Sequence, residues 1–180
     1  MQTSLNIKEP GLNVFPLGVE RYVVNGGGLT GVQILPDDEI EIINDEGNQI
    51  CEITVFNKDG KSELGILNLK ESKNSSEIKK ILFNKNETSL QALYQLKKRN
   101  LDIEKSKSAI LFDKDTVAKE TIKLKSKDKC YCIISAPGNA MLVHEQNPST
   151  DLTVLVKRAE KKPDKEFSVI PDPVYDPSGE

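Results

Sequence analysis

Two cysteines in a C-x-C arrangement are the residues of this sequence whose types and spacing most directly suggest chemistry. Cys130 and Cys132 lie two positions apart in an apolar run, a spacing that directs both thiols to one face of a strand. With Cys51 and His144 they would form a four-ligand zinc site, and His144 would be the histidine partner of a nucleophilic thiol. The alternative is that they are small, buried apolar side chains. We favour this alternative and expect no bound metal.

A glycine-rich stretch suggests a second kind of chemistry. Residues Gly26–Gly31 match the dinucleotide-binding pattern G-x-G-x-x-G letter for letter. That motif works because it follows a strand and opens a helix, whose N-terminus receives the pyrophosphate. Here the next residues, 32–36, are typical of a strand that ends at a proline, so the helix is missing. The glycines therefore either permit close backbone approach or present bare N–H groups to a ligand pocket.

The composition argues against several classes of function. Apolar residues make up 37% of the 180 residues and charged residues 29%, with a net charge of −3. This balance does not favour nucleic acid as a partner, because phosphate neutralisation needs a basic face. No apolar run approaches the roughly 20 residues of a membrane span, and the first ten residues lack a signal-peptide pattern. Three cysteines without framework spacing suit a reducing compartment, so we expect a cytoplasmic protein.

The elements that must position these groups are mostly short segments in which apolar and polar residues alternate. Residues 39–44 and 49–56 alternate with the period of a strand. Between them, Gly47 or Asn48 can take the positive φ that a tight hairpin demands. Further strand-like segments span 108–113, 120–126, 130–136, 139–145 and 151–159. We predict a mainly β fold, an antiparallel barrel or sandwich of about eight short strands.

The chain divides into three parts by composition. Residues 1–20 contain scattered Pro and Gly and are expected to form an irregular N-terminal arm. A β-rich domain over 21–159 holds a helical insertion at 70–107, with one or two capped, amphipathic helices around 75–99. Residues 160–180 contain four prolines and form either an ordered strap or a linker to a further domain.

One part of the chain, residues 26–57, resembles the opening of the urea-carboxylase-associated family. It reads GGGLTGVQILPDDEIEIINDEGNQICEITVFN and shares the glycine pair, the turn ending at Gln49, an acidic residue at Glu52 and the pair Phe56-Asn57. Residues 108–116 and 130–158 look like later strands of the family. Members usually carry Asp at the position of Glu52, and often cysteines in a later segment that here reads Ser135-Ala136-Pro137, without a thiol.

The family module is found in front of folate-dependent aminomethyltransferase-like domains, as in trimethylamine N-oxide demethylase-like and glycine-cleavage T-protein-like proteins. The resemblance implies an N-terminal module that holds a small amine and has an aminomethyltransferase domain as its partner, in cis or in trans. Tetrahydrofolate would be a cofactor only where a further domain follows. We expect a pocket lined by Gly27, Gly28, Gln49, Glu52 and Asn57, in which Glu52 pairs with the ammonium group. A non-catalytic docking β-module and a metal-dependent hydrolase-like domain remain as alternatives.

Overall fold

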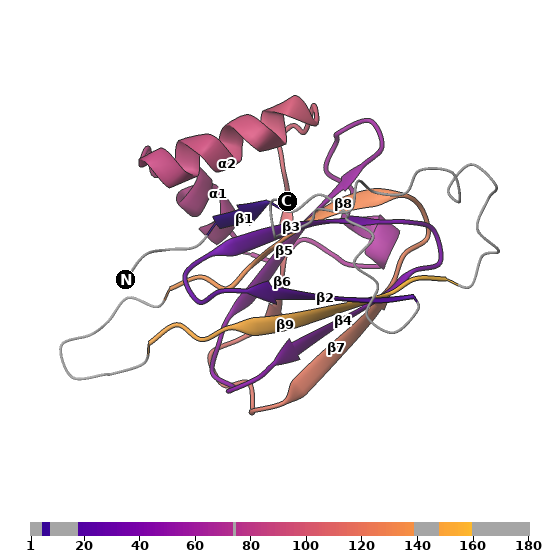
Figure 1. Ribbon diagram of the computed structural model, residues 1–180, viewed down its shortest axis with the longest axis vertical. Coiled ribbons are helices and arrows are strands. Elements are labelled where there is room, and N and C mark those ends of the chain that lie inside the picture. Colours follow the sequence, from indigo (N-terminus) through magenta and orange to yellow (C-terminus); the bar gives the residue numbers. More distant parts are fainter. Residues whose placement is uncertain (1–4, 8–17, 74, 139–147, 160–180) are drawn as a thin grey trace, which may run out of the picture.

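The structure is a computed structural model that describes residues 5–7, 18–73, 75–138 and 148–159. Two β-sheets pack face to face, and helices cover the outer face of one sheet (Figure 1). The first sheet has the order β1 (Leu5–Ile7), β3 (Leu29–Ile34), β8 (Cys130–Ser135), β5 (Cys51–Asn57), β6 (Ser108–Phe112). The second has the order β2 (Val19–Val24), β9 (Leu152–Lys157), β4 (Glu39–Asn44), β7 (Glu120–Lys125).

Antiparallel pairing joins all neighbouring strands except β1, which pairs parallel with β3. The predicted mainly β fold is confirmed, and of its two alternatives the sandwich is the one observed, because the two sheets do not close into a barrel. The predicted strand at 139–145 lies outside the described residues. Within the expected N-terminal arm, the short β1 and the first residues of β2 are strands.

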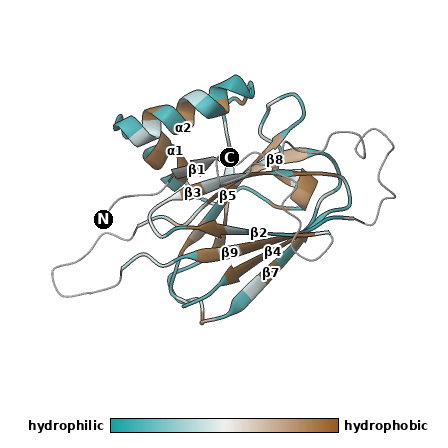
Figure 2. Cartoon of the chain, in the orientation of Figure 1, coloured by the Kyte–Doolittle hydropathy of each residue, from teal (hydrophilic) through white to brown (hydrophobic). Residues whose placement is uncertain are grey.

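Strand β5 is buried on both faces, which explains why its apolar residues do not follow a simple alternation. Cys51, Ile53 and Val55 face the second sheet and belong to the core between the sheets. Phe56 belongs to a second cluster, formed with the helices. Figure 2 shows hydrophobic colours on much of β4 and β9, whereas much of the outermost helix is hydrophilic. The sheet that contains β5 is therefore the middle of three layers.

The helical insertion contains two helices, α1 (Glu77–Leu82) and α2 (Glu87–Lys98), which confirms the helices predicted around 75–99. The N-cap of α2 is Asn86, whose side chain accepts the N–H of Ser89 at 2.7 Å. Ser89 lies on the buried side of α2, and its hydroxyl donates to the carbonyl of Ile81. A short 3₁₀ helix, η1 (Leu64–Leu67), follows β5.

Candidate functional site

Four of the five predicted ligand-binding residues lie at one end of the first sheet. The turn of Gly27 and Gly28 exchanges backbone hydrogen bonds with Ala136, just beyond β8. The side chain of Gln49 donates to the carbonyl of Pro137 at 2.9 Å. Glu52 is paired across the strands with Ser135, the last residue of β8.

The fifth residue, Asn57, lies at the opposite end of β5. At 3.3 Å per residue it is about 17 Å from Glu52 along the strand. Its Oδ1 accepts the N–H groups of Asp59 and Lys61, and its Nδ2 donates to Glu63. Asn57 therefore shapes the turn after β5, and the structure does not place it in one pocket with the other four. The length of an extended strand separates Asn57 from the other four residues, and a ligand-binding role for Asn57 stays a prediction.

The glycine turn permits close backbone approach. A Cβ on Gly26 would lie 2.6 Å from the backbone carbonyl of Ser149. The N–H of Gly26 donates to the carboxylate of Asp151, that of Gly27 to Ala136 and that of Gly28 to Asn25. A strand rather than a helix follows, so the turn lacks the structural context of a dinucleotide site. A ligand-binding role for Gly27 and Gly28 stays a prediction, and in this structure their N–H groups are engaged within the protein.

Gln49 joins three loops through one buried amide. Its Nε2 donates to the carbonyls of Ile50 and Pro137, both at 2.9 Å, and its Oε1 accepts the N–H of Thr150 at 2.8 Å. The side chain is 1% exposed. Because both ends of the amide are used by the backbone, the geometry favours a structural role, and the predicted donation to a ligand is not tested.

Glu52 is the unusual group of this site. Its side chain is fully buried on the helix-facing side of β5. Its Oε2 accepts the N–H of Glu77, the first residue of α1, at 2.9 Å. Its Oε1 has no hydrogen-bond partner within the described residues, and neither has Oγ of the adjacent Ser135. Buried polar atoms without partners are uncommon in native proteins, so two of them on paired residues mark this place as a candidate ligand site.

The surroundings of Glu52 raise the pKa of its carboxyl above the ordinary value of 4.5. Burial is the main cause, since it disfavours the charged form. The nearby hydroxyl of Ser108 and the backbone N–H groups of Glu77 and Ile78 act in the opposite direction. The hydroxyls of Thr54 and Ser108, 2.6 Å apart, extend the polar patch along the strands. Carboxyls perturbed in this way are frequent at functional sites.

The raised pKa of Glu52 predicts a stability that depends on pH. The folded protein binds this proton more tightly than the unfolded chain, so wild-type stability falls as pH rises from about 4.5 through the folded pKa. Glu52→Gln removes the ionisation. We therefore expect the difference in the free energy of unfolding, variant minus wild type, to increase with pH. Urea denaturation of both proteins between pH 4 and 8 measures this difference. Parallel curves for the two proteins would contradict this.

The three cysteines do not form one cluster. Sγ of Cys130 and Sγ of Cys132 are 3.8 Å apart. Cys51 lies at the other end of β5, because Asn57 is the residue that pairs with Cys130. All three thiols are buried in the core between the sheets, as small apolar side chains are. Within the described residues no three His, Cys, Asp or Glu side chains come together as metal ligands, and His144 lies outside those residues.

The participation of Ser135 was not found from the sequence. The register of β5 against β8 decides that Ser135 stands beside Glu52, and no local pattern in the sequence encodes that register.

Neither helix in the described part of the chain has the length and apolar surface that a bilayer crossing requires.

Comparison with known proteins shows a similarity to part of a longer protein. No family model matches the chain. Over 172 residues, 95% of its length, the chain is 33% identical to trimethylamine-oxide aldolase of Ruegeria pomeroyi. The matched region makes up 22% of that protein, so the chain spans about a fifth of the length of its relative. Nearly the whole chain is thus similar to one part of a much longer protein.

Proposed function

We propose that this chain is a small-amine-binding module of an enzyme similar to trimethylamine-oxide aldolase. The observation that carries the proposal is the 33% identity over 95% of the chain to a protein with that name. The proposal includes membership of the urea-carboxylase-associated family and a partner domain, in cis or in trans, that resembles aminomethyltransferases and uses tetrahydrofolate. A cytoplasmic location fits the three free thiols.

Glu52 and Ser135 are the residues proposed to hold the amine. A carboxylate in a region of low dielectric attracts a cation far more strongly than one in water. The unpartnered Oε1 of Glu52 and Oγ of Ser135 would each accept one N–H of dimethylammonium, and the single N–H of trimethylammonium would bind one of them. The methyl groups of the amine would meet apolar side chains, since Leu29 pairs with Ser135 and Ile78 follows the residue whose N–H reaches Glu52.

The amine is proposed to reach Glu52 from the side of α1. A hollow of about 330 Å³ lies at the segment that leads into this helix and is lined by Glu71, Ser72, Lys73, Ser75 and Ser76. Glu52 itself is covered in this structure. Binding therefore requires a small displacement of the start of α1, which admits the ammonium group to the unpartnered Oε1 of Glu52.

Isothermal titration with dimethylammonium, trimethylammonium and trimethylamine oxide tests this proposal. We expect Glu52→Gln to weaken binding about tenfold or more, because a hydrogen bond to a charged group contributes about 1.5–3 kcal/mol. Binding of the protonated amines should strengthen as pH rises through the raised pKa of Glu52, because the carboxylate must ionise to pair with a cation.

The matched control is Glu104→Gln, which neutralises an exposed carboxylate and should leave the affinity unchanged. Absence of heat with all three compounds would contradict the proposal. Equal affinity in Glu52→Gln and wild type would contradict the assignment of the site.

A docking module without a pocket is the second candidate. The hydrogen bonds of the residues expected to face a ligand favour this alternative, because those bonds are made within the protein. The side-chain amides of Gln49 and Asn57 and the N–H groups of Gly27 and Gly28 all bind other parts of the chain. Under this alternative, no amine binds and the isolated chain associates only with its transferase-like partner.

A further inference from the structure

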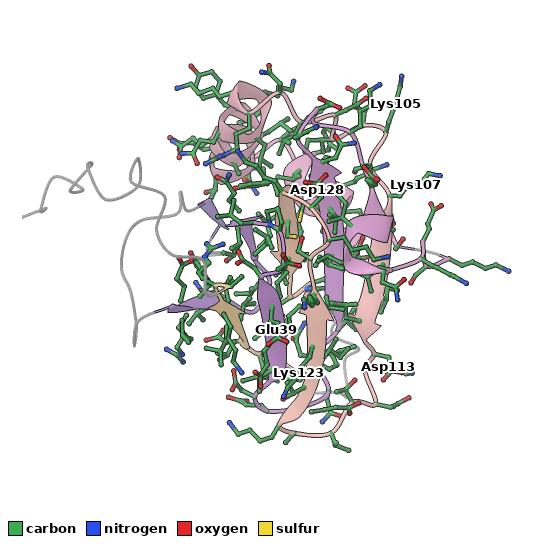
Figure 3. All side chains as sticks on the ribbon, turned by 90° about the vertical axis from the view of Figure 1, so that its right-hand side faces the viewer. Glu39, Lys105, Lys107, Asp113, Lys123 and Asp128 are labelled. Carbon is green, nitrogen blue, oxygen red and sulfur yellow. The ribbon has the colours of Figure 1, made fainter. Side chains whose placement is uncertain are left out.

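The second sheet ends in a strand with an open edge. In the order β2–β9–β4–β7, strand β7 pairs with β4 on one side and with no other described strand on the other. Ile122 and Leu124 pack against the core, whereas Lys123 and Lys125 are exposed. Figure 3 looks onto this side of the molecule and labels Lys123 on β7 beside Glu39 of β4. The unpaired backbone groups of such an edge are a template for a further strand.

A hollow of about 460 Å³ lies beside this edge. It is lined by residues 123–127, by Leu67 and Asn68 after η1, and by Asp37. The N–H of Lys127 donates to the carbonyl of Ile66 at 3.0 Å, which joins the end of β7 to η1. The hollow therefore lies at the end of β7, between η1 and the turn before β4, with Leu67 and Leu124 as its apolar residues.

The charges around the hollow are mainly positive and unpaired. Within the described residues, none of Lys123, Lys125 and Lys127 forms an ion pair with a carboxylate within 4.0 Å. Glu41, the residue opposite Lys123 on β4, binds Nζ of Lys157 at 3.1 Å instead. Glu39 stands opposite Lys125, and Asp37 is the acidic residue of the lining. Three lysines thus line the hollow together with one carboxylate, that of Asp37.

We propose that the open edge of β7 binds an extended acidic peptide as an added strand. Strand addition derives its affinity from main-chain hydrogen bonds and its specificity from alternate side chains. Lysines on an edge strand oppose pairing with most other strands, but they attract one that carries carboxylates at alternate positions. The intervening side chains of the peptide would lie on the other face of the added strand, the face on which β7 carries Ile122 and Leu124.

Fluorescence anisotropy tests the proposal with a fluorescein-labelled hexapeptide of alternating Glu and Val. We expect binding at low salt that weakens as salt is added, and no binding of the same peptide with Lys in place of Glu. Lys123→Glu together with Lys125→Glu should weaken binding about tenfold, because two attractions become repulsions. Lys58→Glu together with Lys114→Glu makes the same change of charge at exposed positions elsewhere and should change affinity less than about twofold.

A second peptide separates strand addition from simple attraction of charges. Methylation of alternate backbone nitrogens, on the side that would face β7, removes the main-chain donors and leaves the charge unchanged. We expect this peptide to bind about tenfold more weakly than the unmethylated one. Equal binding of the two peptides, equal effects of the two double substitutions, or binding of an oligothymidylate as tight as that of the acidic peptide would each overturn the proposal.

Discussion

Arg158→Met is expected to lower the free energy of unfolding by about 3–5 kcal/mol, because it leaves two partly buried carboxylates without their counter-ion. The guanidinium donates to Asp38 at 2.6 Å and to both oxygens of Glu20 at 2.7 and 3.0 Å. It also donates to the carbonyl of Gln33 at 3.1 Å. Asp38 is only 2% exposed, so water cannot replace the lost partner. One side chain from the end of β9 thereby ties together β2, β3 and the turn before β4.

Urea denaturation monitored by circular dichroism measures this effect. Arg21→Met is the matched control, since Arg21 is exposed on β2, and it should change stability by less than about 0.5 kcal/mol. Arg158→Lys should recover only part of the loss, because an ammonium group cannot bind a carboxylate with the two-pronged geometry of a guanidinium. Similar stabilities of Arg158→Met and Arg21→Met would show that the network contributes little.

Gln49→Leu is expected to lower the free energy of unfolding by about 2–4 kcal/mol. The substitution introduces an apolar side chain of similar size and leaves the carbonyl of Pro137 and the N–H of Thr150 without their partner. A buried backbone group that loses its hydrogen-bond partner costs about 1–3 kcal/mol of stability. The loops that follow β8, precede β5 and precede β9 would then lose the amide that joins them.

Chemical denaturation of Gln49→Leu and of the control Gln95→Leu, an exposed position on α2, measures this effect. The result also separates the two roles considered for Gln49. If the only role of Gln49 were to bind a ligand, the substitution should weaken amine binding and leave stability unchanged. The geometry instead predicts a large loss of stability. A variant as stable as wild type would contradict the structural role.

The two large effects bear on the candidate site in different ways. Gln49 fastens the loops that follow β8 and precede β9 to the end of the first sheet at which Glu52 and Ser135 lie. A change at Gln49 would therefore disturb amine binding indirectly. Arg158 lies beyond the end of β9, close to the turn before β4, and its loss should lower stability without moving Glu52. Comparing amine affinity in the two variants under folding conditions tests this distinction.

Part of the candidate site could be predicted from the sequence. The turn at Gly47, the acidic residue Glu52 and the glycine stretch were each recognisable from residue type and spacing, and the structure brings the glycine turn, Gln49 and Glu52 to one end of a sheet. Asn57 was grouped with them because it is close in sequence. A strand of seven residues carries it to the opposite end instead.

The sequence by itself determined the type of most elements. Alternation with a period of two marked the strands, capping residues and an amphipathic stripe marked the helices around 75–99, and Gly or Asn marked the turns. These signals arise from backbone sterics and from local hydrogen bonds, so they can be read over a few neighbouring residues.

Only the tertiary structure decided which strands pair and which faces are covered. The pairing of β5 with β8 places Ser135 beside Glu52 and separates Cys51 from Cys130. The packing of α1 on that face covers Glu52 and raises the pKa of its carboxyl. Such contacts depend on the register of strands about 80 residues apart in the chain, which is set by the fit of whole apolar faces rather than by any local pattern.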